Sequence, residues 1–151
     1  MNVNELMLCE RSPFWSIRVR QAIDETQTRV REVRSLQQCS TALKASNSAL
    51  AVVEITEGNL AEVCTWTRKL VDDSPHPEIV VVGDRNLQEF EWLLRESGVL
   101  HAFFSPREVH RLSSILARCK DHFHLQEDAR AAPFVSLADF DQIWSKLPWQ
   151  S

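Results

Sequence analysis

The sequence predicts a single α/β domain, a doubly wound three-layer sandwich with helices on both faces of a five-stranded parallel sheet. Short apolar runs alternate with segments of helical period, an order typical of βαβ units around a parallel sheet. The hydrophobic content of 44% and the charged content of 25% are ordinary for a globular protein. A length of 151 residues suits one domain whose core needs no disulfide or metal.

The first half of the chain contains three of the predicted strands. Residues 6–9 form a first buried strand, and Pro13 suits the opening of the helix that follows. Residues 28–33 form a weak second strand, too charged to be central, whereas residues 50–53 form a clear buried strand that ends at Glu54. The three helices after these strands have apolar faces at Trp15, Val19, Ala22 and Ile23, at Leu36, Cys39 and Leu43, and at Leu60, Val63, Cys64, Thr67 and Val71.

The second half of the body begins after a proline-containing break at residues 72–77. Residues 79–82 are β-branched and uncharged, which makes them the strongest strand prediction. A fourth helix follows, which Gly98 is placed to end, and residues 102–104 form a fifth strand. The apolar positions of the fourth and fifth helices are Leu87, Phe90 and Leu94, and Val109, Leu112, Leu116 and Cys119.

The pattern changes after the fifth helix. We expect a body over residues 1–124, a linker over residues 125–135 and an amphipathic C-terminal helix within residues 136–151. A helix this short is unstable alone in water, so it must dock on the body, on a second protomer or on a partner protein. Its apolar stripe comprises Leu137, Phe140, Ile143, Trp144 and Leu147.

Charge and cysteine usage exclude several classes of function. The net charge of −4 argues against nucleic-acid or membrane binding, and we interpret the early arginines as a solvated or ion-paired face. The chain shows neither a signal peptide nor a long apolar stretch, so we expect a cytoplasmic protein. No cysteine pair has CxxC spacing, which favours buried, reduced thiols over disulfides or zinc. These thiols are Cys9, Cys39, Cys64 and Cys119.

From residue 4 to about residue 123, the order of elements resembles the receiver domain of bacterial response regulators, which has a CheY-like, flavodoxin-like fold. The most specific stretch runs from Gly83 to Pro106. In it, a helix, Ser97-Gly98, a strand and Ser105-Pro106 follow the spacing from the family's switch hydroxyl to its Lys-Pro.

The resemblance implies a phosphorylation site at which most of the required residues are replaced. Receivers hold Mg²⁺ with an acidic pair, accept the phosphoryl group on an aspartate and contact it with a hydroxyl and a lysine, because phosphoryl transfer depends on charge neutralisation and positioning. The matching positions here are Glu10-Arg11, Glu54, Gly83 and Ser105. We therefore expect a degenerate pseudo-receiver with no metal and no cofactor. We also expect Arg11 to pair with Glu10 or Glu54 in place of the metal.

Enzyme motifs in the same fold class fit poorly. The C-x5-R phosphatase motif starting at Cys9 reaches Trp15, and three glycines in the chain are too few for a phosphate-cradling loop. His122 and His124 lack further metal ligands at convincing spacing. We therefore expect a non-catalytic signalling or scaffold module that binds a protein partner or itself, including a homodimer formed through the tail. The alternative is a small flavodoxin-like ligand-binding protein or enzyme whose site is not recognised.

Overall fold

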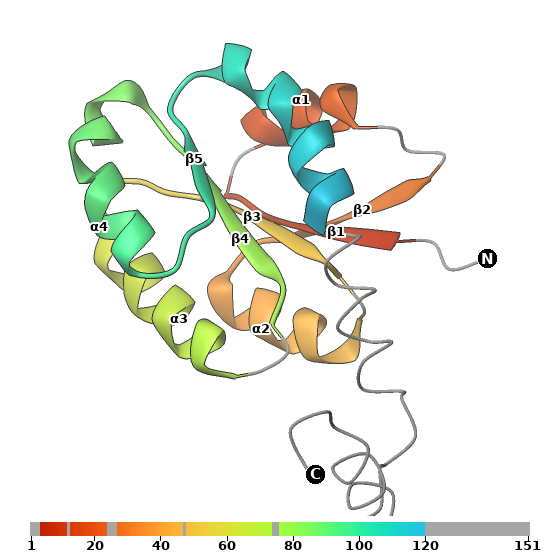
Figure 1. Ribbon diagram of the computed structural model, residues 1–151, viewed down its shortest axis with the longest axis horizontal. Helices are drawn as coiled ribbons and strands as arrows, with labels where there is room; N and C mark the ends of the chain where they lie inside the picture. Colours follow the sequence, from red (N-terminus) through yellow and green to blue (C-terminus); the bar gives the residue numbers. More distant parts are fainter. Residues whose placement is uncertain (1–3, 12, 24–26, 47, 74–75, 120–151) are drawn as a thin grey trace, which may run out of the picture.

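A single parallel sheet forms the middle layer of the protein (Figure 1). The computed structural model describes residues 4–11, 13–23, 27–46, 48–73 and 76–119. The strand order is β2-β1-β3-β4-β5, and every neighbouring pair is parallel. The strands are β1 (Asn4–Cys9), β2 (Thr28–Val33), β3 (Leu50–Glu54), β4 (Glu78–Val82) and β5 (His101–Phe103). The predicted three-layer fold with five parallel strands is confirmed.

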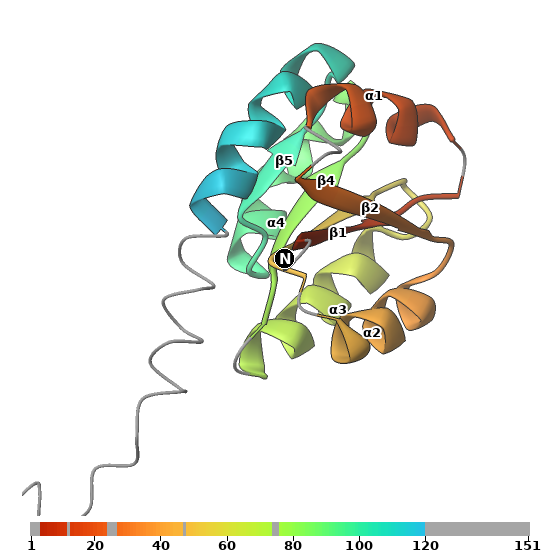
Figure 2. The ribbon, with the colours of Figure 1, turned by 90° about the vertical axis from the view of Figure 1, so that its right-hand side faces the viewer.

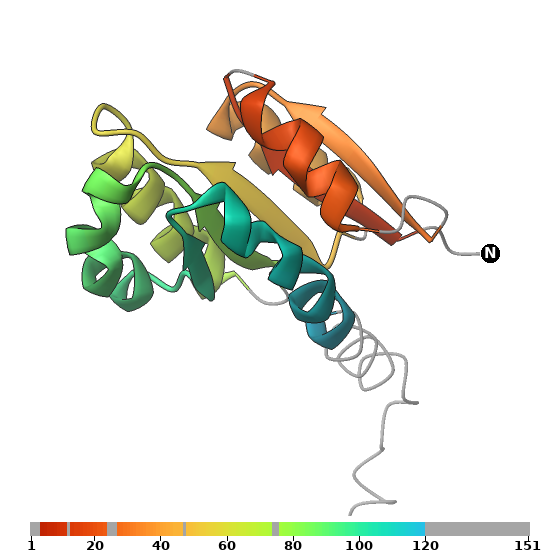
Figure 3. The same cartoon turned by 90° about the horizontal axis from the view of Figure 1, so that it is seen from above.

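Helices cover both faces of this sheet (Figures 2 and 3). One face carries α1 (Phe14–Ala22) and a last helix that begins as η2 (Pro106–Arg111) and continues through residues 112–119. We refer to this last helix as helix 106–119. The other face carries α2 (Leu36–Ala45), α3 (Leu60–Asp72), η1 (Arg85–Phe90) and α4 (Glu91–Glu96).

The central strands are apolar on both sides because each face of the sheet is covered by helices. Successive residues of β1, β3 and β4 point alternately to the two faces, so each strand contributes to two separate core clusters. The cluster under α2 and α3 includes Met7, Ala51, Val53, Ile79 and Val81. The cluster under α1 and helix 106–119 includes Leu6, Leu8, Val52, Val80 and Phe103.

The charged strand β2 lies at one edge of the sheet, as its composition predicts. Its buried residues face the body, while Arg31 lies 3.9 Å from the carboxylate of Glu5 on β1. Glu32 forms an ion pair with Arg20 on α1 at 3.1 Å. These contacts fit the interpretation of the early arginines as a solvated, partly ion-paired face.

Several element boundaries differ from the sequence prediction: β1 begins at Asn4 rather than at residue 6, and β4 begins at Glu78 rather than at residue 79. The fourth and fifth helices both begin as 3-10 turns, where Leu87 N donates to Asp84 O and Glu108 N donates to Ser105 O. Strand β5 ends at Phe103, because that residue pairs with Val82, the last residue of β4. Phe104 therefore remains buried but has no partner in the ladder.

Gly98 ends α4, as predicted, and its backbone explains why a glycine stands there. Its φ of +108° is strained for any residue with a side chain, and an added Cβ would lie 2.7 Å from Cγ2 of Val71 on α3. The glycine therefore lets α4 stop and the chain turn back closely against α3 toward β5.

The predicted C-terminal helix and the linker before it lie outside the described residues, as do Leu137, Phe140, Ile143, Trp144 and Leu147. Within the part of the chain that the structure describes, no helix is long and apolar enough to cross a membrane.

Candidate functional site

The carboxyl ends of the parallel strands meet at one edge of the sheet, where ligands bind in folds of this type. A small pocket of about 80 Å³ lies there, beside β1 and β3. Glu10, Arg11 and Glu54 line it, whereas Gly83 and Ser105 do not. The structure thus brings together three of the five positions that the sequence singled out.

Glu10 is committed to the start of α1. Its side chain is only 2% exposed, and its two carboxylate oxygens accept hydrogen bonds from the backbone amides of Trp15 and Ser16, each at 2.9 Å. The first amides of a helix have no partner within the helix, and the positive end of the helix dipole stabilises an anion. Glu10 therefore acts as the N-terminal cap of α1. The sequence prediction missed this role, although an acidic residue shortly before a helix that opens after Pro13 is a signal for it.

Glu54, at the end of β3, has a carboxylate that is less fully hydrogen-bonded than that of Glu10. Its Oε2 is buried and has no hydrogen-bond partner among the described residues. Burial raises the pKa of Glu54, and repulsion from Glu10 and Asp84 raises it further, while the backbone amide and guanidinium of Arg11 act in the opposite direction. This carboxyl group is therefore held in surroundings that disfavour its charge.

The loop after Glu54 is held by Asn59. The Asn59 side-chain amide donates to the Glu54 carbonyl at 3.0 Å, and its Oδ1 accepts from the Thr56 amide at 2.7 Å. This double contact ties the loop to the start of α3 and fixes the backbone beside the pocket.

The expected ion pair of Arg11 is not found. The Arg11 side chain is exposed, and no ion pair within 4.0 Å connects it to Glu10 or Glu54 across the described part of the chain. Glu10 needs no cation because the α1 amides already satisfy it. The Arg11 carbonyl accepts a long hydrogen bond of 3.4 Å from the guanidinium of Arg34, so the two arginines meet through backbone rather than through a shared carboxylate.

Gly83 fills a position with no room for a side chain. A Cβ there would lie 2.7 Å from Cγ1 of Ile55, 3.1 Å from the Ile55 carbonyl oxygen and 3.2 Å from Cδ1 of Leu87. The Gly83 amide donates to the Phe103 carbonyl at 3.0 Å, which joins the ends of β4 and β5. A serine or threonine could occupy this position only if the loop after β3 moved.

Ser105 follows β5 and serves the next helix. Its hydroxyl accepts a hydrogen bond of 3.4 Å from the Arg107 amide, and Pro106 opens η2. The side chain at this position is therefore used as a helix cap, which the Ser-Pro sequence itself indicates.

The thiol beside the pocket is not activated. Burial, with a contribution from Glu54, raises the pKa of Cys9 to about 11, so the thiol stays protonated and is a poor nucleophile. Burial also raises the pKa of Cys39 to about 12 and that of Cys119 to about 11. All four cysteines are buried and free, which confirms the interpretation as core thiols.

The residues at this edge do not fit the Mg²⁺ ion that the resemblance implies. Mg²⁺ needs near-octahedral oxygen ligands, yet both Glu10 oxygens already accept amide hydrogen bonds, and the adjacent position is a cation, Arg11. Among the residues that the structure describes, no group of three or more His, Cys, Asp or Glu side chains is placed to hold a metal.

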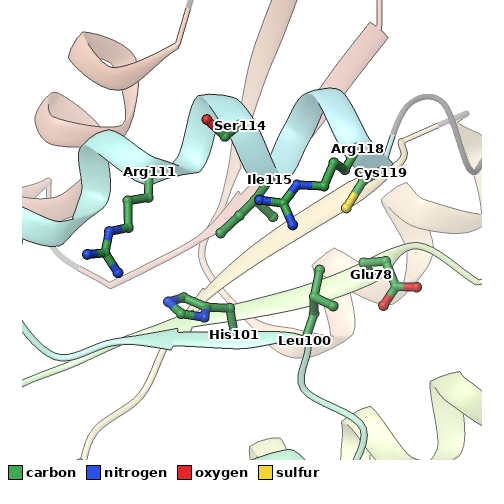
Figure 4. Close-up of a pocket in the computed structure, with 8 residues that line it drawn as sticks. All are labelled: Glu78, Leu100, His101, Arg111, Ser114, Ile115, Arg118 and Cys119. Atoms are coloured by element: carbon green, nitrogen blue, oxygen red, sulfur yellow. The ribbon is translucent and has the colours of Figure 1, made fainter.

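A second cavity, of about 510 Å³, lies on the other side of the sheet, and the sequence did not predict it. Helix 106–119 forms one wall, and the segments around β4 and β5 form the other (Figure 4). We call it the β5 groove. Its lining residues are Glu78, Leu100, His101, Arg111, Ser114, Ile115, Arg118 and Cys119.

The sheet order and the helices on both faces define the CheY-like, flavodoxin-like fold. No protein-family model and no curated protein matches the sequence. Solved receiver structures do match the fold. A response regulator from Thermotoga maritima has a TM-score of 0.64 and 17% identity, covering 82% of this chain and 99% of that one. A CheY-like protein (tadZ) from Pseudomonas aeruginosa PAO1 has a TM-score of 0.65 and 14% identity, covering 77% and 98%.

A CheY-like response regulator receiver domain protein from Methanospirillum hungatei JF-1 is similar over 85% of this chain and 99% of its own, with a TM-score of 0.57 and 13% identity. At these identities the likeness establishes the fold. What the chain does must be argued from its own residues.

Proposed function

We propose that this protein is a receiver-like signalling or scaffold module that works by binding other proteins, without catalysis and without phosphorylation of an aspartate. The observation that carries the proposal is the state of Glu10. Its carboxylate occupies the place where a receiver would bind its metal, and both of its oxygens are bound to amides of α1. Releasing them for a metal would leave two backbone donors unpaired.

The other positions of the site support the same proposal. Gly83 stands where a receiver would have its switch hydroxyl, and a Cβ at this position would clash with its neighbours. Ser105 stands where a lysine would neutralise the phosphoryl group, and its hydroxyl caps η2 instead. Stabilising a transferred phosphoryl group requires fixed positive charge and a metal at this point. Among the described residues, this edge of the sheet offers neither in the arrangement needed.

Glu54 permits two interpretations, a permanent charge that mimics phospho-aspartate or a strand-end carboxylate with a structural role. Burial raises the pKa of Glu54, and Oε2 has no partner among the described residues, so these surroundings stabilise a negative charge less well than water does. We therefore favour the structural role. Signalling by this module then depends on its surfaces rather than on a charge at this position.

Incubation of the purified protein with acetyl phosphate and Mg²⁺, followed by intact-mass spectrometry, tests the proposal. We expect the mass to stay unchanged. A stoichiometric, base-labile adduct of roughly 80 Da, the mass of one phosphoryl group, would overturn the proposal. Glu54→Gln is the matched control, because loss of such an adduct in this variant would place the phosphoryl group on Glu54. A small ligand that co-purifies stoichiometrically would instead favour the ligand-binding alternative.

A further inference from the structure

The β5 groove combines an apolar surface with positive charge. Leu100, just before β5, is 40% exposed, and Ile115 faces it from helix 106–119. Figure 4 shows Arg111, Ile115 and Arg118 projecting from the helix toward the strand side of the groove. An exposed leucine opposite a helix wall that carries two arginines forms a surface that can receive an amphipathic, acidic segment.

The positive charge of the groove is available for a partner. Within the described ranges, neither Arg111 nor Arg118 forms an ion pair. Burial lowers the pKa of His101, and Arg95 contributes to this, so the imidazole between the strand and the helix adds no lasting charge at neutral pH. Glu78, at the start of β4, is the one carboxylate among the lining residues. The two arginines therefore set the sign of the surface.

The chain itself carries a segment that matches this surface, and the connection that leads to this segment starts at the groove. Cys119, the last described residue, lines the groove. Residues 120–135 lie between it and the predicted helix at residues 136–148. Extended at roughly 3.3 Å per residue, they reach about 50 Å, so the helix can return to the groove from which the chain departs. Tethering of this kind gives an effective concentration in the millimolar range.

The charges of the predicted helix complement those of the groove. At about 100° per residue, Leu137, Phe140, Ile143, Trp144 and Leu147 form one stripe, and Asp139 and Asp141 fall on opposite flanks of it. A helix that lays this stripe on Leu100 and Ile115 and crosses helix 106–119 would place the two aspartates on opposite sides of Ile115, along the wall that carries both arginines. The arginines at positions 111 and 118 can meet such a pair.

We infer that residues 136–148 dock as a helix in the β5 groove of their own chain. The apolar stripe packs on Leu100 and Ile115, and Asp139 and Asp141 pair with Arg111 and Arg118. A protein partner that uses this face must then displace the tail. This contact depends on the groove and the tail alone, so it stands whether or not the pocket at the carboxyl edge is phosphorylated.

Amide NMR spectra of the ¹⁵N-labelled full-length protein test the docking. We expect Phe140→Ser/Trp144→Ser to shift the amide resonances of Leu100, His101 and Ile115. Gln142→Ala, on the polar side of the same predicted helix, is the matched control and should leave these resonances in place. Identical groove resonances in wild type and in the double variant would overturn the inference.

Charge reversal provides a second, independent measurement. Arg111→Glu/Arg118→Glu and Asp139→Arg/Asp141→Arg should each release the tail and shift the resonance of Leu100. Their combination should return this resonance toward its wild-type position, since the pairs are restored with opposite sign. Effects that simply add, with no rescue, would contradict the pairing. Light scattering should show a monomer at all concentrations, and a dimer that becomes monomeric on Trp144→Ser would assign the tail to a second copy and overturn docking within one chain.

Discussion

The pocket at the carboxyl edge of the sheet and the β5 groove differ in how far the chain satisfies its own polar groups. In the pocket, of about 80 Å³, Glu10 is capped by α1 amides. At Gly83, close packing against Ile55 and Leu87 leaves no room for a side chain. In the groove, of about 510 Å³, Arg111 and Arg118 have no ion-pair partner among the described residues. Leu100 also remains partly in water there.

This difference follows from burial. A polar group removed from water is stable only with a partner inside the protein, and in the pocket Glu10 has such partners in the α1 amides whereas Glu54 Oε2 has none among the described residues. An exposed arginine is solvated at little cost and can stay unpaired until a partner arrives. Under the proposed function, the carboxyl edge of the sheet has a structural role, and the surface that we propose for recognition lies on another face.

The largest expected effect comes from removing the Glu10 cap. Glu10→Ala leaves the amides of Trp15 and Ser16 without their acceptors in a buried site, which should lower the free energy of unfolding by about 2–4 kcal/mol. Glu10→Gln keeps one acceptor oxygen and should lose less. Urea unfolding measures both. Glu62→Ala, at an exposed position lining the same pocket, should change stability by no more than about 0.5 kcal/mol. Equal losses at positions 10 and 62 would contradict the capping role.

Introducing a hydroxyl-bearing side chain at position 83 should also destabilise the protein. Gly83→Thr drives a side chain into Ile55 and Leu87, and overpacking of this kind costs about 1–3 kcal/mol. Gly58→Ala is the matched control, since the nearest atom to its Cβ would be Thr56 Oγ1 at an ordinary 3.7 Å, and we expect a change below about 0.5 kcal/mol. Thermal unfolding of the two variants distinguishes them. A fully stable Gly83→Thr protein would show that the loop after β3 yields easily and that the switch position is open.

The Glu54 carboxyl should make stability depend on pH. Its pKa is higher in the folded chain than in the unfolded one, so the protonated form favours folding. This contribution is present at low pH and is lost as the pH rises through the folded pKa. Glu54→Gln, which is neutral throughout, should therefore raise the unfolding temperature more at about pH 7 than at about pH 4. Glu89→Gln, at an exposed position, should change it little. A Glu54→Gln protein that is less stable than wild type at neutral pH would favour a stabilising charge at this position.

The smallest effect is expected at Arg11. Because its side chain is exposed and makes no ion pair with Glu10 or Glu54, Arg11→Ala should cost less than about 1 kcal/mol in urea unfolding. Arg20→Ala, which removes the 3.1 Å contact with Glu32, offers a surface comparison of similar size. A loss at Arg11 as large as the loss in Glu10→Ala would mean that the cation and the carboxylates act as one buried network.

The fold was largely predictable because the residue types within each short stretch of sequence indicate its secondary structure and its burial. The β-branched residues of β4 predict a buried strand, the charges of β2 predict an edge strand, and Gly98 predicts the end of α4. Each of these predictions needs only the residue types within a short stretch of sequence. The burial of the four cysteines was predictable for the same reason, since each occupies an apolar position of a strand or helix.

The sequence by itself therefore determined the order of strands and helices, the edge position of β2 and the list of residues at the carboxyl edge of the sheet. Only the tertiary structure decided what those residues do. Hydrogen-bond geometry assigned Glu10 to the amides of α1 and left Arg11 in solvent, and a 2.7 Å approach to Ile55 explains Gly83. The β5 groove joins Glu78, Leu100 and Arg118, which stand far apart in the chain. Periodicity reports which side of its own element a residue faces, whereas a site depends on which elements meet, and that is set by packing across the whole domain.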